Sequence, residues 1–259
     1  RAADDFADEP GSSTRERLRL LDEELERLHA ALGAVPPADL EPGGGAHVAT
    51  APDPASADRI FLALAHTIRS RELPVALFEA LLSAFRQDVT VTRYETWAAV
   101  DDYCRRSANP VGRLVLRLFG HRDERLDRWS DAICTALQLT NFWQDFGVDW
   151  SRGRLYVPEE AWRAVAADPA GLSSAMVTTP PAWQKALAAC GARTAALFDH
   201  GRPLLAHTRG RLRWELAATW HGGRRILERL EQSRFDPVAH RPTLGAADAL
   251  VIGWRLLAS

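Results

Sequence analysis

The chain has little of what marks several common protein classes. Its three cysteines, Cys104, Cys134 and Cys190, include no CxxC pair, and their odd number argues against a disulfide framework. No apolar run approaches the roughly 18 residues that a membrane-spanning helix needs. The net charge of −2 over 259 residues leaves no basic surface for nucleic acid. A globular protein of a reducing cytoplasm is therefore expected, with no nucleic-acid partner.

Several well-known catalytic and binding motifs are also absent. The sequence contains no GxxxxGK[ST], GxGxxG or GxSxG, and its eight histidines form no HExxH or other ligand spacing. Nucleotide-binding loops, nucleophile elbows and histidine metal sites therefore have no support.

Helical patterns dominate, because alternating β-branched runs are few while Ala, Leu, Arg and Glu are abundant. Residues 14–32 carry leucines three and four apart, with Ser12 or Ser13 as the expected N-cap and Gly33 as the stop. Residues 36–54 are rich in Pro and Gly and predict a loop between helices. Further helices are expected at 56–70, 74–90, 94–107, 110–119, 124–147, 180–208, 211–232 and 243–257. The prediction is an all-α bundle in which residues 1–259 form a single domain with its site between facing helices.

Three oxygen-bearing side chains, Asn141, Asp145 and Asp149, follow one another at helical spacing. Residues four apart lie on one face of a helix, so the two carboxylates would repel each other there. Apolar and aromatic residues surround them in the sequence, and buried carboxylates are costly unless they are paired or bound to a metal. The alternative is a solvated helix face with ordinary ion pairs.

A second acidic cluster, Asp4, Asp5 and Asp8, repeats the four-residue spacing near the start of the sequence. Such a run near a terminus is usually a surface segment. Mg²⁺, however, commonly joins one or two carboxylates to substrate phosphates. Two such clusters that face each other could hold a diphosphate between them through shared Mg²⁺.

Two neighbouring segments carry further candidates. Arg152 and Arg154 in SRGRLYVP could reach diphosphate oxygens, or could form ion pairs within a surface turn. In YCRRSANPVG, Pro110 disfavours helix at Asn109, so a break is expected there, either at a functional site or as a simple turn. Tyr103 in the same segment is a candidate for the site or a core tyrosine.

These pieces together resemble one family. RAADDFADE, YCRRSANPVG, LQLTNFWQDFGVDWSRGRLYVP and, more loosely, WHGGRRILERL followed by Arg241–Pro242 are similar to segments of squalene/phytoene synthases, the head-to-head isoprenyl diphosphate synthases. The resemblance covers most of the length from Arg1 to Pro242. It implies an all-α isoprenoid synthase bundle with a central apolar cavity.

The resemblance also implies roles for individual residues. The implied Mg²⁺ ligands are Asp4, Asp5, Asp8, Asn141, Asp145 and Asp149. Arg1 and Arg154 would contact the diphosphate, and Tyr103 would lie near the reacting cation. Phe142 and Phe146 are candidates for cation–π stabilisation of that cation.

Two departures from the family pattern refine the expectation. Many members carry Arg immediately before the first Asp of the second motif, where this chain has Gln144. NFWQD looks most like the hydroxysqualene synthase branch of bacterial hopanoid pathways, which uses water where squalene synthase uses hydride, so NADPH is not expected. Gln144 could orient that water. The chain also starts at the first motif, whereas the family begins with further helices, so it is expected to lack its N-terminal helices.

Three alternatives remain open. A sister enzyme could make presqualene diphosphate, squalene, dehydrosqualene or phytoene. A non-catalytic helical lipid-binding protein could keep the fold without the chemistry. A metal-dependent hydrolase of nucleotide diphosphates would need a polar base pocket, which the apolar flanks do not favour. The expected partner is an isoprenoid diphosphate in the cytoplasm, and its apolar chain is compatible with peripheral contact at the inner face of the membrane and with coupling to other hopanoid-pathway enzymes.

Overall fold

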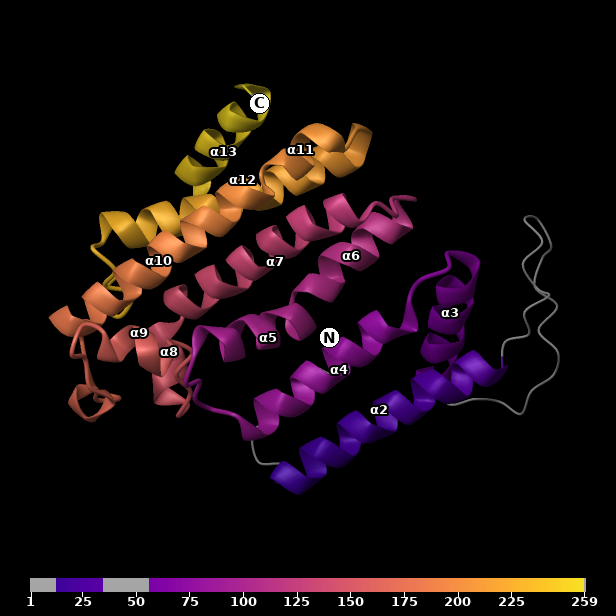
Figure 1. The fold of residues 1–259 in the computed structure, drawn as a ribbon, viewed down its shortest axis with the longest axis horizontal. Coiled ribbons are helices and arrows are strands. Elements are labelled where there is room, and N and C mark those ends of the chain that lie inside the picture. Colours follow the sequence, from indigo (N-terminus) through magenta and orange to yellow (C-terminus); the bar gives the residue numbers. More distant parts are fainter. Residues whose placement is uncertain (1–12, 35–55, 259) are drawn as a thin grey trace. The chain divides into compact units, whose positions relative to one another are not determined.

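The computed structural model describes residues 13–34 and 56–258, and helices make up most of them (Figure 1). The elements are α2 (Thr14–Ala34), α3 (Ser56–Ser70), α4 (Val75–Thr90), α5 (Trp97–Ser107), α6 (Asn109–Leu118), α7 (Glu124–Gln144), α8 (Phe146–Ser151), α9 (Glu159–Arg163), the 3₁₀ turn η1 (Pro169–Gly171), α10 (Pro181–Gly201), α11 (Pro203–His207), α12 (Gly210–Gln232) and α13 (Ala246–Ala258). Within these residues there is no strand, only one parallel bridge between Arg93 and Leu155. The all-α prediction is confirmed.

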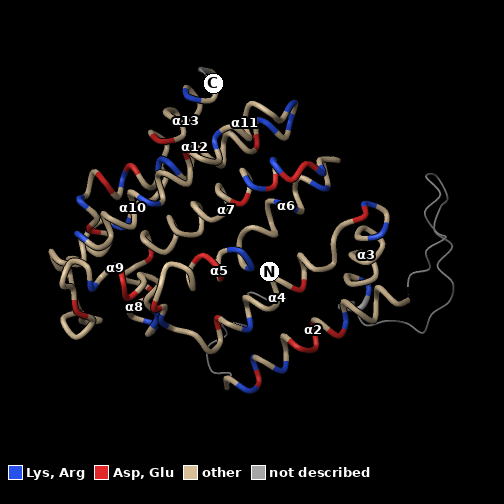
Figure 2. The backbone as a smooth tube through the Cα atoms, in the orientation of Figure 1, with Lys and Arg blue, Asp and Glu red and all other residues tan. Residues whose placement is uncertain are grey.

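The chain divides into two compact units, each described by itself. The first comprises residues 1–90 and 114–121, where α2 packs against α3 and α4. The leucine stripe predicted for α2 is confirmed, since Leu21 and Leu28 are buried and the other leucines of the stripe pack beside them. The backbone N–H of Glu16 donates to Ser13 Oγ over 3.2 Å, so Ser13 is the N-cap. Acidic and basic residues both occur along α2 (Figure 2).

The second unit comprises residues 91–113 and 122–259, and α7 is its central helix. α7 packs against α5, α10, α11 and α12, and α13 packs on α12. Trp143 on α7 is fully buried, and its indole N–H donates to Thr194 Oγ1 on α10 over 2.9 Å. A Cβ atom at Gly201 would lie 2.7 Å from the carbonyl oxygen of Trp129, so a glycine is needed where the end of α10 packs on α7.

Four predicted helices differ from those observed, and the one predicted from residue 243 begins at Ala246. The helix predicted at 124–147 is interrupted at Asp145, and the one predicted at 180–208 divides at Arg202, since Pro203 has no N–H with which to continue the hydrogen-bond ladder. The helix predicted from residue 94 begins at Trp97, because the Thr96 side chain caps it. α9 and η1 were not predicted, and the predicted loop at 36–54 lies outside the described residues.

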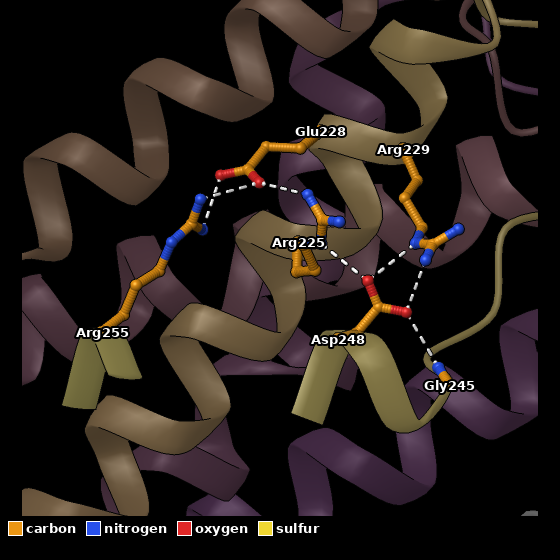
Figure 3. A network of polar contacts seen from close by, with 6 residues as sticks. All are labelled: Arg225, Glu228, Arg229, Gly245, Asp248 and Arg255. Carbon is orange, nitrogen blue, oxygen red and sulfur yellow. Dashed lines mark hydrogen bonds and ion pairs between the residues drawn. The ribbon is translucent and has the colours of Figure 1, made fainter. Parts of the chain in front are cut away.

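A network of ion pairs fixes the start of α13 against α12 (Figure 3). The carboxylate of Asp248 is fully buried and accepts from Arg225 Nε (2.7 Å), from Arg229 Nε and Nη2 (2.9 and 2.7 Å) and from the backbone N–H of Gly245 (2.9 Å). The connection between the two helices is thereby anchored where α13 begins. That connection carries Arg241.

The cysteine expectation is confirmed, since all three cysteines are unpaired. Burial raises the pKa of the Cys134 thiol to about 11 and that of Cys190 to about 12, and it also raises the pKa of Cys104, so these thiols stay protonated near neutral pH. Over the two described ranges, 13–34 and 56–258, no helix is both long enough and apolar enough to cross a bilayer.

Candidate functional site

The predicted stripe of Asn141, Asp145 and Asp149 survives the break between α7 and α8. The N–H of Asp145 donates to the carbonyl of Asn141 over 2.9 Å, and the N–H of Asp149 donates to the carbonyl of Asp145 over 2.8 Å. Helical four-residue spacing therefore continues through Asp145, although its φ and ψ of −97° and 9° are not helical. Asn141 Nδ2 also donates to Asp145 Oδ2 over 3.0 Å, which brings these two side chains together.

Arg241 reaches the same carboxylate from the connection between α12 and α13. Its Nε and Nη2 both lie 2.6 Å from Asp145 Oδ1. The hydrogen bond to Asp145 raises the pKa of Arg241, with smaller contributions from the charges of Asp145 and Asp149, so both carboxylates act on this guanidinium. Asp145 thus has a protein cation on one oxygen and an amide on the other.

Gln144 lies beside this ion pair and bonds to the same connection. Its Nε2 donates to the carbonyl oxygen of Pro242 over 2.6 Å. The residue that departs from the family pattern therefore holds the backbone that follows Arg241. Its predicted role in orienting water stays a prediction.

An open pocket of about 440 Å³ lies at this connection. It is lined by Arg229, Gln232, Ser233, His240, Arg241, Pro242 and Thr243. Two of these residues are arginines and none is acidic, so the pocket favours an anion or water over an apolar group.

Aromatic rings gather around Tyr103, which is 4% exposed. Phe142 and Tyr156 stack face to face with ring centroids 3.8 Å apart, and Tyr103 lies 6.0 Å from Phe142 and 6.2 Å from Tyr156. Tyr94 completes the cluster at 5.8 Å from both tyrosines. The structure thus brings Tyr103 of α5 and Phe142 of α7 together. Phe142 precedes Asp145 by about one helical turn.

Phe146, the other predicted aromatic residue, lies elsewhere. Its ring packs against Trp183 of α10 with centroids 5.4 Å apart. It is 3% exposed and contributes to the core on the α10 side of α7.

Two backbone bonds explain why tyrosines distant in the sequence meet. The N–H of Leu155 donates to the carbonyl of Thr92 over 2.9 Å, and the N–H of Glu159 donates to the carbonyl of Tyr94 over 2.9 Å. The segments before α5 and after α8 therefore run side by side. Tyr156 follows the second acidic motif in SRGRLYVP, which is the sequence pattern that could have identified it.

Arg154 lies directly after the acidic stripe. Gly153 takes a φ of +81° and ends α8, and the N–H of Arg154 then donates to the carbonyl of Asp149 over 2.8 Å. Arg154 is partly buried and Arg152 is exposed. This turn brings the backbone of Arg154, the predicted diphosphate contact, against that of Asp149.

The predicted break at Asn109 and Pro110 is observed between α5 and α6. Asn109 is buried, and its Oδ1 accepts from the hydroxyl of Thr135 on α7 over 2.9 Å. The break therefore ties Asn109, the first residue of α6, to α7 through a satisfied polar pair, which matches the simple-turn alternative.

The stripe of Asn141, Asp145 and Asp149 offers oxygen atoms of the kind that bind Mg²⁺. Carboxylate and amide oxygens are the ligands that Mg²⁺ prefers, and a guanidinium already lies where a cation would meet Asp145. Among the described residues, no group of three or more His, Cys, Asp and Glu side chains could hold a metal ion by itself. Arg1, Asp4, Asp5 and Asp8 lie outside the described residues, so the facing of the two motifs stays a prediction.

Comparisons with known proteins agree on one family. A squalene/phytoene synthase family model matches residues 1–248. The hydroxysqualene synthase of Rhodopseudomonas palustris is 36% identical over 200 residues, covering 76% of this chain and 66% of the relative. That of Zymomonas mobilis is 37% identical over 177 residues, covering 66% of this chain and 56% of the relative. The chain thus spans less than two thirds of each relative.

Solved structures give the same result. The squalene synthase HpnC of Alicyclobacillus acidocaldarius superposes with a TM-score of 0.75 at 33% identity, covering 91% of this chain and 80% of that one. A dehydrosqualene synthase with a ligand superposes with a TM-score of 0.73 at 17% identity, covering 99% of this chain and 81% of that one, which supports the fold alone.

Proposed function

Because the chain belongs to the squalene/phytoene synthase family, we propose that it acts as a hydroxysqualene synthase, which converts presqualene diphosphate and water into hydroxysqualene and diphosphate. The observation that carries the proposal is the stripe of Asn141, Asp145 and Asp149 next to a cluster of aromatic rings. The two relatives named hydroxysqualene synthase support the branch within the family.

In this proposal, the oxygens of Asn141, Asp145 and Asp149 would hold Mg²⁺ together with the first acidic motif. Bound Mg²⁺ would supply charge stabilisation for the departing diphosphate. Arg154 would contact the diphosphate oxygens, since a guanidinium matches phosphate geometry.

The reaction balances without a redox cofactor. The C–O bond to the diphosphate breaks and its electron pair leaves with the diphosphate. After rearrangement, the oxygen of water bonds to the carbocation and one proton is lost. Aromatic faces of Tyr103, Phe142 and Tyr156 could stabilise the cation by about 2 kcal/mol each when desolvated. NADPH has no role in this scheme.

Product analysis of the complete enzyme tests the proposal. With presqualene diphosphate, Mg²⁺ and ¹⁸O-labelled water, we expect labelled hydroxysqualene in equal amounts with and without NADPH. Squalene that forms only with NADPH would reject water capture. Turnover of farnesyl diphosphate to presqualene diphosphate, or of geranylgeranyl diphosphate to phytoene, would identify a sister enzyme. Mg²⁺-independent lipid binding without turnover would indicate a non-catalytic protein.

The proposal also covers where the protein acts and with which partners. Substrate and product both carry long apolar chains, which favours peripheral contact with the inner face of the membrane and functional coupling to other hopanoid-pathway enzymes. Sedimentation with anionic lipid vesicles, with and without 0.5 M added salt, tests the membrane contact.

A further inference from the structure

We propose that Arg241 is the resident counter-ion of Asp145 before metal binds, that Gln144 holds it there, and that its guanidinium leaves this oxygen when a divalent cation enters. The inference rests on the proposed function, because it takes Asp145 as a ligand of Mg²⁺. It gives Gln144 a positioning role at the second acidic motif.

The first argument is that both oxygens of Asp145 are in use. Oδ1 accepts from Arg241 Nε at 2.6 Å and lies 2.6 Å from Arg241 Nη2, and Oδ2 accepts from Asn141 at 3.0 Å. A cation that binds Oδ1 has to displace the guanidinium, because the two positive charges would compete for one oxygen.

The second argument is that this exchange costs little. The side chains of Arg241 and Asp145 are 46% and 20% exposed, and ion pairs with this much solvent access contribute little to stability. Arg241 also lines the open pocket of about 440 Å³, where water can solvate the released guanidinium. Arg241 is therefore suited to occupy Asp145 reversibly.

The third argument concerns Gln144. An arginine at this position, as in many family members, would bring a positive charge from α7 itself. Here the Gln144 side chain bonds to the carbonyl of Pro242 at 2.6 Å, and the charge comes from the preceding residue, Arg241. The lost arginine is thus replaced by a pair of residues 97 positions apart that acts as one unit.

Mn²⁺ affinity, measured by electron paramagnetic resonance on the complete protein without substrate, tests the inference. Arg241→Gln should tighten Mn²⁺ binding by about fivefold, because it removes a competitor worth about 1 kcal/mol. Gln144→Ala should tighten it by roughly twofold, since Arg241 is then held less firmly. The double variant should equal Arg241→Gln alone, because Gln144 acts only through Arg241.

Arg234→Gln is the matched control, since it removes an exposed positive charge from the same connection and should leave Mn²⁺ affinity unchanged. If Arg241→Gln does not fold, Arg241→Lys serves in its place and should show a smaller tightening. Unchanged or weaker Mn²⁺ binding in the Arg241 variant, additive effects in the double variant, or no Mn²⁺ binding in any variant would overturn the inference.

The Asp145→Asn variant distinguishes failure of this inference from failure of the proposed function. Loss of Mn²⁺ binding in Asp145→Asn together with an unchanged Arg241→Gln would reject only the exchange. Full Mn²⁺ affinity in Asp145→Asn would reject the metal role of Asp145, and with it both proposals.

Discussion

Two aspartates of the second unit pair with arginines, yet their surroundings differ. Asp248 is fully buried and accepts four hydrogen bonds, three from arginines and one from a backbone N–H (Figure 3). The Asp145 side chain is 20% exposed and bonds to one arginine and one amide. Both carboxylates lie on or beside a helix, and the three arginines that bond to them belong to α12 or to the connection that follows it.

Burial and the number of bonding partners distinguish a carboxylate that supports the fold from one that can exchange its partner. Both oxygens of Asp248 accept hydrogen bonds, from two arginines of α12 and from the backbone N–H of Gly245, so removing the partners leaves a buried charge uncompensated. Asp145 keeps contact with solvent, and its cation lies on a side chain that water can also reach. Four predictions test this contrast, from the largest expected effect to the smallest.

Asp145→Asn should lower Mg²⁺-dependent diphosphate release from presqualene diphosphate by roughly 100- to 1,000-fold, because it removes a ligand of the Mg²⁺ that would stabilise the departing diphosphate in the transition state. The fold should be retained, since the side chain keeps its shape and its access to water. Steady-state kinetics and far-ultraviolet circular dichroism measure the two outcomes.

Asp131→Asn is the control for this variant. Asp131 is also on α7 and is 18% exposed, and it pairs with Arg113 over 2.9 Å, about 21 Å along the helix from Asp145. Its turnover should stay within about twofold of wild type. A similar loss of turnover in both variants would show that ion pairs along α7 matter only for the fold.

Asp248→Asn should have the opposite profile. The melting temperature should fall by several degrees, because Arg225 and Arg229 lose the charge that compensates them. Turnover per folded molecule should persist below the melting temperature. Differential scanning calorimetry compares the two aspartate variants, and a larger loss of stability in Asp145→Asn would reverse the contrast.

The stability of the wild-type protein should depend on the ionisation of Asp248. The N–H of Gly245, followed by Arg225 and Arg229, lowers the pKa of this carboxyl to about 2. A lowered folded-state pKa contributes stability that is present above the unfolded pKa of about 3.9 and is lost as pH falls toward 2. Urea unfolding between pH 4 and pH 2 should therefore show a steeper loss in wild type than in Asp248→Asn. Parallel curves would contradict the assignment.

Local sequence patterns predicted much of the fold. The leucine spacing and Ser13 defined α2 to within two residues, because capping and amphipathic periodicity act within one helix. The break at Asp145 was not predicted, since apolar residues continue at helical spacing on both sides of it. Pro203, in contrast, carried a local indication of a helix end that the predicted helix at 180–208 passed over.

The site was predictable only as far as its residues are neighbours in the sequence. The stripe of Asn141, Asp145 and Asp149 follows from spacing, and two of the aromatic candidates, Tyr103 and Phe142, lie within 6.0 Å of each other. Arg241 is 96 residues from Asp145, and Tyr94 and Tyr156 meet through pairing of distant segments. Such contacts depend on tertiary packing, which no local pattern encodes.

Arg241→Gln should have the smallest effect on stability of these variants. Its response to Mg²⁺ distinguishes the two aspartates most directly. A partly exposed ion pair contributes at most about 1 kcal/mol, so the melting temperature should change by less than about 4 °C. Arg229→Gln, the control on the buried carboxylate, should cost more. Millimolar Mg²⁺ should reverse the loss in Arg241→Gln, because a bound metal supplies the missing positive charge at Asp145. It should not rescue Arg229→Gln, since Asp248 is closed to solvent. Equal losses in the two variants, or rescue of both, would mean that Asp145 and Asp248 are carboxylates of the same kind.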